Sequence, residues 1–311
     1  MPPCVVTGVT FSSSHTGPAN IHERGYPTSR PICETREPAA SSACEISRPS
    51  KADARELLPL ESRSMALRES EAIVLRTYPL READLLVTLF TRAEGKIHGV
   101  ARSAKKSKRR FGGALEPLTY VRAFYDVRER QDLVRLDSCE VLESPLASEV
   151  SYARAVALGH IAELLDELLP DHEANDAIFR LTLSVLHILT GPEIWMPITY
   201  FDLWLTRLVG FLPELTECVV CGRSLNGDRA YFHALADGLM CADDRRLASS
   251  EISSESRALA AKMFRCPVET FVCTKWPKSQ AADLRKLLIQ ILQRHIEKKL
   301  VTASILEQVS F

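Results

Sequence analysis

The fold is decided by residues 71–101, which read EAIVLRTYPLREADLLVTLFTRAEGKIHGVA. Short runs rich in β-branched and aromatic residues alternate here with polar or glycine turns, a pattern typical of β-strands. Five such runs lie in and beyond this stretch, at 72–75, 84–90, 96–101, 119–125 and 133–141. The sequence therefore predicts five short strands before Pro145.

Five short strands cannot cover both faces of a flat sheet, and a closed barrel leaves no exposed strand edge. We therefore expect a small five-stranded barrel of the oligonucleotide-binding type over residues 65–145. An SH3-like barrel is the structural alternative.

Beyond Pro145 the apolar residues recur with the helical period of 3.6. Three apolar stripes show this period, one through Leu158 and Ile161, one over 194–208 and one over 284–291. The segment 178–189 is apolar on nearly every side, which predicts a central helix of a bundle. The sequence thus predicts an α+β protein, with the barrel followed by a mainly α-helical domain over residues 146–311.

Composition excludes several classes of protein. The chain has 311 residues, enough for two domains, and its 46% hydrophobic and 25% charged residues are ordinary for a globular protein. No uncharged apolar stretch reaches the roughly 18 residues that a membrane span needs. Nine cysteines are too few for a disulfide scaffold, and two form a C-x-x-C pair, which favours a reducing compartment. We expect a cytoplasmic protein with no membrane partner.

Residues 1–64 differ from the rest of the chain. They hold eight of the 17 prolines and many serines, and no period of 2 or 3.6 is sustained. Patterned sequence begins almost immediately after Met65. We expect this leader to be unstructured, and we favour an upstream start-codon artefact over a regulatory tail.

The first chemical feature is a basic run between the third and fourth predicted strands. Six cations occur in nine residues without one acid, although the net charge of the chain is only -1. Like charges packed this closely repel each other unless they meet an anion, and a nucleic-acid backbone releases counterions at each contact. The run therefore predicts contact with nucleic acid, with a solvated loop as the alternative. Its cations are Arg102, Lys105, Lys106, Lys108, Arg109 and Arg110.

The second chemical feature is a pair of cysteine motifs. Cys218 and Cys221 form a C-x-x-C-G knuckle, and Cys241 follows with Asp244 at the spacing of a fourth ligand. Such a set can share a tetrahedral zinc ion. Asp243 and His233 are alternative fourth ligands, and a degenerate site without metal is the remaining alternative. We expect a zinc-knuckle-like insert at 216–246, with a structural zinc if one binds.

Catalysis is not expected, because the sequence has no P-loop, G-x-G-x-x-G, G-x-S-x-G or H-E-x-x-H motif. The knuckle also lacks the H-x-E and P-C-x-x-C pair of a nucleoside deaminase. A zinc hydrolase remains the enzymatic alternative, and it would need an exchangeable water on the metal. The chain is therefore predicted to bind and arrange its substrate rather than to transform it.

Several motifs in this order resemble the bacterial RecO family of DNA repair proteins, over about residues 66 to 300. They are the stretch 71–84, the strand 96–102 running into the basic loop, Leu115-Glu-Pro-Leu118, and Gly210-Phe-Leu-Pro213 before the knuckle. The resemblance implies an oligonucleotide-binding fold, binding of single- and double-stranded DNA, and annealing of complementary strands. An RNA-binding module without annealing activity is the alternative.

The resemblance also implies partners and site residues. Its partners would be RecR and the C-terminal tail of single-strand-binding protein, with RecA recombinase loaded indirectly, in the cytoplasm at the nucleoid. The zinc-bearing members commonly use four cysteines, so Asp244 departs from their pattern. The DNA-binding surface of the family would fall here on Arg76, Arg81, Lys96, Arg102, Lys105, Lys106, Lys108, Arg109 and Arg110.

Overall fold

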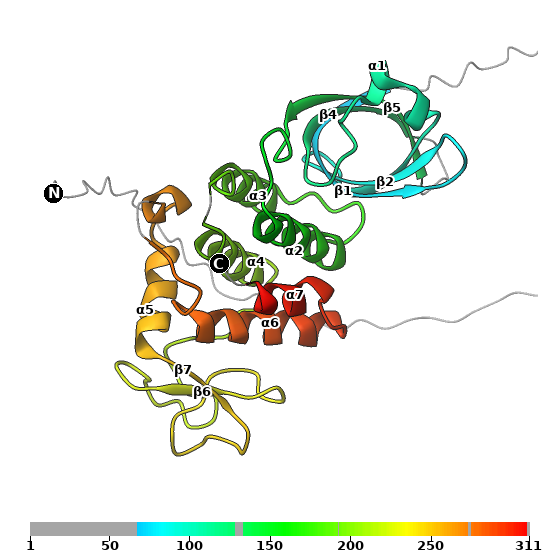
Figure 1. Ribbon diagram of the computed structural model, residues 1–311. Coiled ribbons are helices and arrows are strands. Elements are labelled where there is room, and N and C mark those ends of the chain that lie inside the picture. The colour runs from blue at the N-terminus through cyan, green and yellow to red at the C-terminus, as the bar shows by residue number, and fades with distance from the viewer. Residues whose placement is uncertain (1–66, 128–132, 192, 273–274, 310–311) are drawn as a thin grey trace, which may run out of the picture. The chain divides into compact units, whose positions relative to one another are not determined.

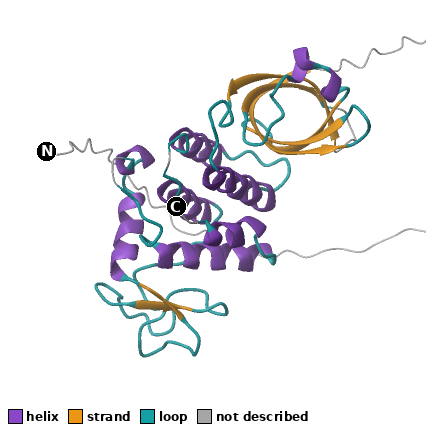
Figure 2. Cartoon of the chain, viewed as in Figure 1, coloured by secondary structure: helices purple, strands orange, loops and turns teal. Residues whose placement is uncertain are grey.

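A computed structural model describes residues 67–127, 133–191, 193–272 and 275–309 (Figure 1). The predicted leader at 1–64 lies outside the described residues. Strands form a barrel in the first part of the chain, and helices form most of the remainder (Figure 2). None of the helices described is both long enough and apolar enough to span a bilayer.

The barrel is closed, as the sequence predicted, with the strand order β1-β2-β3-β5-β4 and β4 returning to β1. All neighbouring strands are antiparallel except β3 and β5, which run parallel. Its strands are β1 (Leu67–Pro79), β2 (Leu85–Thr91), β3 (Gly95–Ala101), β4 (Tyr120–Asp126) and β5 (Leu133–Glu143).

Strand β1 is much longer than the run 72–75 that its apolar residues predicted. Ala72 and Val74 face the barrel interior, while Ile73 and Leu75 belong to the core that the helices form. Burial on both faces explains the uninterrupted apolar run, because an alternating pattern needs one solvent-exposed face. The polar ends of the strand were missed because they carry no such signal.

The helical part confirms the three predicted stripes. Ser151, Asn175 and Ser253 cap α2, α3 and α5 by accepting hydrogen bonds from backbone N–H groups in the first turn. Two short elements, η1 (Ala104–Lys106) and α1 (Lys108–Phe111), precede β4, and η2 (Val268–Phe271) follows α5. The main helices are α2 (Tyr152–Leu168), α3 (Asp176–Ile188), α4 (Trp195–Leu208), α5 (Ser254–Met263), α6 (Ala282–Ile296) and α7 (Val301–Gln308).

The central helix of the bundle is α4 and not the segment 178–189, where it was predicted. Helix α3 exposes Arg180, Ser184 and His187 along one face. Eleven of the 14 residues of α4 are buried, Thr199 and Thr206 among them. These two hydroxyls donate to backbone carbonyls one turn earlier, so α4 carries polar residues into the core without losing hydrogen bonds. Because α4 contains these polar residues, the pattern of apolar residues did not indicate that it is the more deeply buried helix.

The outer face of the barrel packs with the helices in one apolar core, which is separate from the core inside the barrel. Phe90 on β2 packs edge-on against Phe179 on α3 with the ring centroids 5.3 Å apart, and Tyr120 on β4 contacts the same ring. Phe90 and Phe179 are fully buried. Burial of a large aromatic side chain stabilises a fold by about 2 to 3 kcal/mol, so this contact holds the two parts firmly together.

A second contact joins the start of β3 to the segment that links α2 to α3. The His172 N–H donates to the Lys96 carbonyl over 2.9 Å. Gly95 has a φ of +73°, and a Cβ there would collide with the Glu173 backbone. Glycine is thus required at this position both for its conformation and for the close approach of the two chain segments.

Candidate nucleic-acid interface and metal site

The basic loop between β3 and β4 is fixed to the turn between β1 and β2. The Ser103 N–H donates to Asp84 Oδ1 over 2.8 Å, and the Lys105 N–H donates to the Ala83 carbonyl over 3.2 Å. Arg81 lies in the same turn and is exposed. These bonds bring Arg81 and the basic loop, which are about 20 residues apart in sequence, to one end of the barrel.

Arg110 holds the loop in shape. Its guanidinium donates to the Arg102 carbonyl over 2.6 Å, to the Asp137 carbonyl over 3.3 Å and to Ser107 Oγ over 3.1 Å. It also lies over the ring of Phe111, which is buried in the barrel core. Arg110 is therefore a positioning residue for the loop.

The other cations of the loop are exposed, and no ion pair among the described residues includes any of them or Arg81. Uncompensated cations gathered on one surface create a positive potential that attracts polyanions. We call these residues the free cation cluster: Arg81, Arg102, Lys105, Lys106, Lys108 and Arg109.

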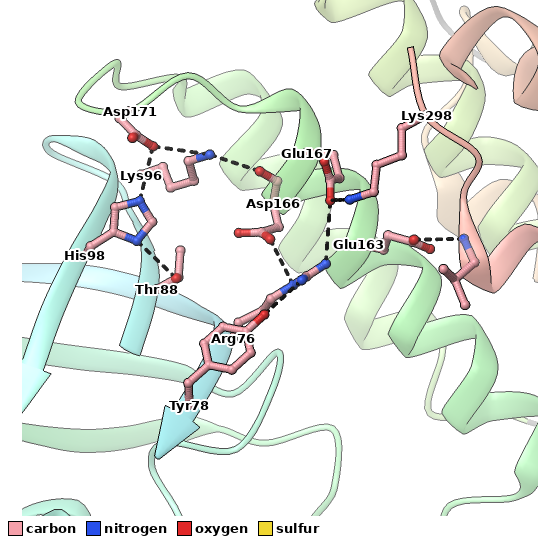
Figure 3. Close-up of polar contacts among 11 residues, drawn as sticks. Arg76, Tyr78, Thr88, Lys96, His98, Glu163, Asp166, Glu167, Asp171 and Lys298 are labelled. Atoms are coloured by element: carbon pink, nitrogen blue, oxygen red, sulfur yellow. Dashed lines mark hydrogen bonds and ion pairs between the residues drawn. The ribbon is translucent and has the colours of Figure 1, made fainter. Parts of the chain in front are cut away.

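Arg76 and Lys96, the remaining predicted DNA contacts, instead contact acidic residues at the end of α2 and just after it (Figure 3). Arg76 Nε is 2.8 Å from Asp166 Oδ2. Lys96 Nζ donates to the Asp166 carbonyl over 2.9 Å and lies 3.2 Å from Asp171 Oδ1. Burial raises the pKa of Asp171, but hydrogen bonds and charge from Lys96 and His98 together outweigh it and leave that pKa below its ordinary value. Both cations are therefore neutralised within the chain.

These acidic partners were missed by the sequence reasoning. Asp166, Glu167 and Asp171 lie at the end of α2 and just after it, and Glu167 also pairs with Lys298 over 2.5 Å. The signal was present as a run of acids after an apolar stripe. Only the fold shows that this run faces strands β1 and β3.

The predicted metal ligands come together in the segment between α4 and α5, beside the small sheet of β6 (Ala230–Phe232) and β7 (Ser250–Ile252). One ligand atom from each of Cys218, Cys221, Cys241 and Asp244 lies within 4.8 Å of the others. The Sγ atoms of Cys221 and Cys241 are 3.8 Å apart, and Asp244 Oδ2 is 3.3 Å from Cys218 Sγ.

The alternative fourth ligands are engaged elsewhere. Asp243 forms an ion pair with Arg223 over 2.7 Å, and His233 Nδ1 accepts from the Leu235 N–H over 3.1 Å. Neither belongs to the cluster that contains Asp244. The structure therefore selects Asp244 from the three candidates.

The donor set fits a zinc ion. Tetrahedral Zn–S bonds of about 2.3 Å place two thiolates about 3.8 Å apart, the separation found between Cys221 and Cys241. The hydrogen bond to Asp244 is the main cause that raises the pKa of the Cys221 thiol to about 12, and the same bond is the largest cause that lowers the pKa of Asp244. Thiols bind a metal in their deprotonated form, so a divalent cation bound here would replace the thiol protons. Four side chains could hold a metal here.

Comparison with known proteins identifies the family. The family model described as "Recombination protein O N terminal" matches residues 65–145, and "Recombination protein O C terminal" matches residues 150–303. The DNA repair protein RecO of Koribacter versatilis (strain Ellin345) is 65% identical over 243 residues, which cover 78% of this chain and 99% of the relative.

More distant relatives match the same part of the chain. The DNA repair protein RecO of Anaeromyxobacter sp. (strain Fw109-5) is 33% identical over 76% of this chain and 94% of its own length. The protein of the same name from Geobacter sulfurreducens is 31% identical over 77% of this chain and 97% of its own length. The chain therefore belongs to the RecO family of DNA repair proteins.

Proposed function

We propose that this protein binds single- and double-stranded DNA, anneals complementary strands and, with RecR, helps to load RecA recombinase. The observation that carries the proposal is the free cation cluster on one end of a closed barrel. The family and the printed names of the relatives, which concern DNA repair, support it. Arg76 and Lys96 are left out of the proposed surface because carboxylates already neutralise them.

The proposed mechanism needs no bond-making step. Two DNA strands repel each other through their phosphates, and a cationic surface that holds both lowers this repulsion. Complementary bases then meet more often, and pairing completes the reaction. Phosphate contacts alone do not distinguish DNA from RNA, so competition between matched DNA and RNA strands tests the alternative of an RNA-binding module.

The metal site is proposed to hold a structural zinc, and the protein is proposed to be non-catalytic. Cys218, Cys221, Cys241 and Asp244 supply four ligands, and a closed tetrahedral site has no open position for a reacting water. When bound, zinc would supply folding energy to the insert by linking its two cysteine motifs.

We propose that the acidic, apolar C-terminal tail of single-strand-binding protein docks on the helical part of the chain and brings it to coated DNA, in the cytoplasm at the nucleoid.

The proposed function is tested by the annealing of two complementary DNA strands that are coated with single-strand-binding protein. The full chain should anneal them, and a loop variant with Lys105, Lys106, Lys108 and Arg109 replaced by alanine should not. Equal annealing by both chains would refute the proposal.

Loss of one thiolate should remove the metal. Cys218→Ser is expected to lower bound zinc from about one ion per chain to none, because serine is a poor zinc ligand at neutral pH. Metal analysis of the purified chain measures this, and protease cleavage within residues 216–246 should accelerate. Cys266→Ser, a cysteine outside the cluster, is the matched control. Equal zinc in wild type and Cys218→Ser would exclude the site.

A further inference from the structure

The outer face of strands β1, β2 and β3 is only half covered by the helices. The covered half carries Phe90 and Lys96, which contact α3 and the end of α2. On the other half, the strand register places Tyr78 opposite Leu86 and Leu86 opposite Val100. We call these three side chains the open row. It lies on the side of the barrel that continues into the free cation cluster.

The open row is partly accessible and apolar. Tyr78 is 47% exposed, and Leu86 and Val100 are half-buried. Val100 pairs in turn with Arg135 on β5, so a half-buried cation continues the row onto that strand. An exposed aromatic ring within an apolar row, with cations at its borders, matches the surface that unpaired bases and their phosphates need.

Tyr78 is held in place by a hydrogen bond from a neighbouring side chain. Its hydroxyl accepts a hydrogen bond from Arg76 Nη1 over 3.0 Å, and Arg76 is itself fixed by Asp166 at the end of α2 (Figure 3). This chain of contacts gives Arg76 a role other than binding phosphate. It orients the ring before any ligand arrives, which reduces the entropy lost on binding.

We propose that the open row is a stacking site for unpaired nucleobases, with Tyr78 as its platform, while the free cation cluster holds the phosphates of the same strand. This inference rests on the proposed function and adds a base-contacting site to it. Stacking on an aromatic ring tolerates any base, because every base has a π face. Bases in a duplex are already stacked and paired, so the open row should favour single strands.

The test compares Tyr78→Ala with the full-length wild type on three fluorescent probes of equal length. The probes are a thymidine oligonucleotide, an abasic strand with the same phosphates, and a duplex. Tyr78→Ala should bind the oligonucleotide about tenfold more weakly and bind the abasic strand and the duplex as the wild type does. The dependence of affinity on salt should keep its slope, because no phosphate contact is lost. Tyr152→Ala, an exposed tyrosine at the start of α2, is the control.

Two further variants keep the test decisive. Tyr78→Phe retains the ring and should keep most of the single-strand affinity. Tyr78→Leu retains apolar volume without a ring and should lose that affinity. The leucine variant thus replaces Tyr78→Ala in the test if the alanine variant does not fold. Equal single-strand affinity of the leucine variant and the wild type would overturn the inference, as would equal losses on strand and duplex. If the loop variant binds weakly while the Tyr78 variants bind normally, the stacking site fails and the proposed function stands.

Discussion

Alanine at Lys105, Lys106, Lys108 and Arg109 is expected to weaken single-stranded DNA binding by several hundred-fold at 0.1 M salt. Each phosphate contact on a single strand contributes a slope of about 0.7 to the dependence of log affinity on log salt, so four contacts contribute about 3. The four side chains are exposed and have no acidic partner among the described residues, so their loss should cost little stability. Fluorescence anisotropy across a salt series measures affinity and slope together.

The matched control removes four exposed cations from the helical part, at Arg265, Lys275, Lys286 and Lys299. Net charge changes equally in both variants, so only the position of the charges differs. The control should keep the wild-type slope within about half a unit. Similar losses in both variants would mean that total charge governs binding, and the free cation cluster would then have no special role.

Gly95→Ala should destabilise the protein by roughly 3 to 5 kcal/mol, because the substitution forces the backbone to move in a packed region. A methyl group there would collide with the Glu173 backbone as well as strain a positive φ. Gly113→Ala isolates the strain alone, because Gly113 has a φ of +74° and open space around its Cβ position. This control should cost about 1 to 2 kcal/mol.

Urea unfolding measures both glycine variants. The midpoint should fall further for Gly95→Ala than for Gly113→Ala, with the slope of free energy against urea unchanged if the unfolded states are alike. Equal midpoints would show that the start of β3 can move away from the segment after α2. The close contact at Glu173 would then not hold the barrel and the helices together.

Local pattern was sufficient for the barrel and the metal cluster, but not for the partners of individual charges. Cys218, Cys221, Cys241 and Asp244 were predicted because their spacing in the sequence is typical of zinc ligands, and their ligand atoms do lie together. Arg76 and Lys96 look in sequence like the other cations that precede the basic loop. Arg76 and Lys96 differ from those cations only because the end of α2 contacts the barrel beside them. Such a long-range contact leaves no periodic signal in the sequence.

The burial of α3 and α4 was misjudged for a related reason. The run of apolar residues predicted the central helix at 178–189, whereas α4 is more deeply buried and contains Thr199 and Thr206. A threonine that bonds the backbone of its own helix can be buried at little cost, and hydropathy alone does not record that bond. Tyr78 was not singled out either, because its exposure depends on how far the helices extend over the sheet.

Strand β1 has a practical consequence for dissecting the protein. Ile73, Leu75 and Phe90 are fully buried only because the helices cover them. A fragment that ends near Pro145 would present these side chains to water as one apolar patch on the outer face of β1 and β2, and we expect it to self-associate. Expressing residues 65–145 and 150–303 separately is therefore a poor way to measure their individual activities, and these activities are better measured with variants of the whole chain.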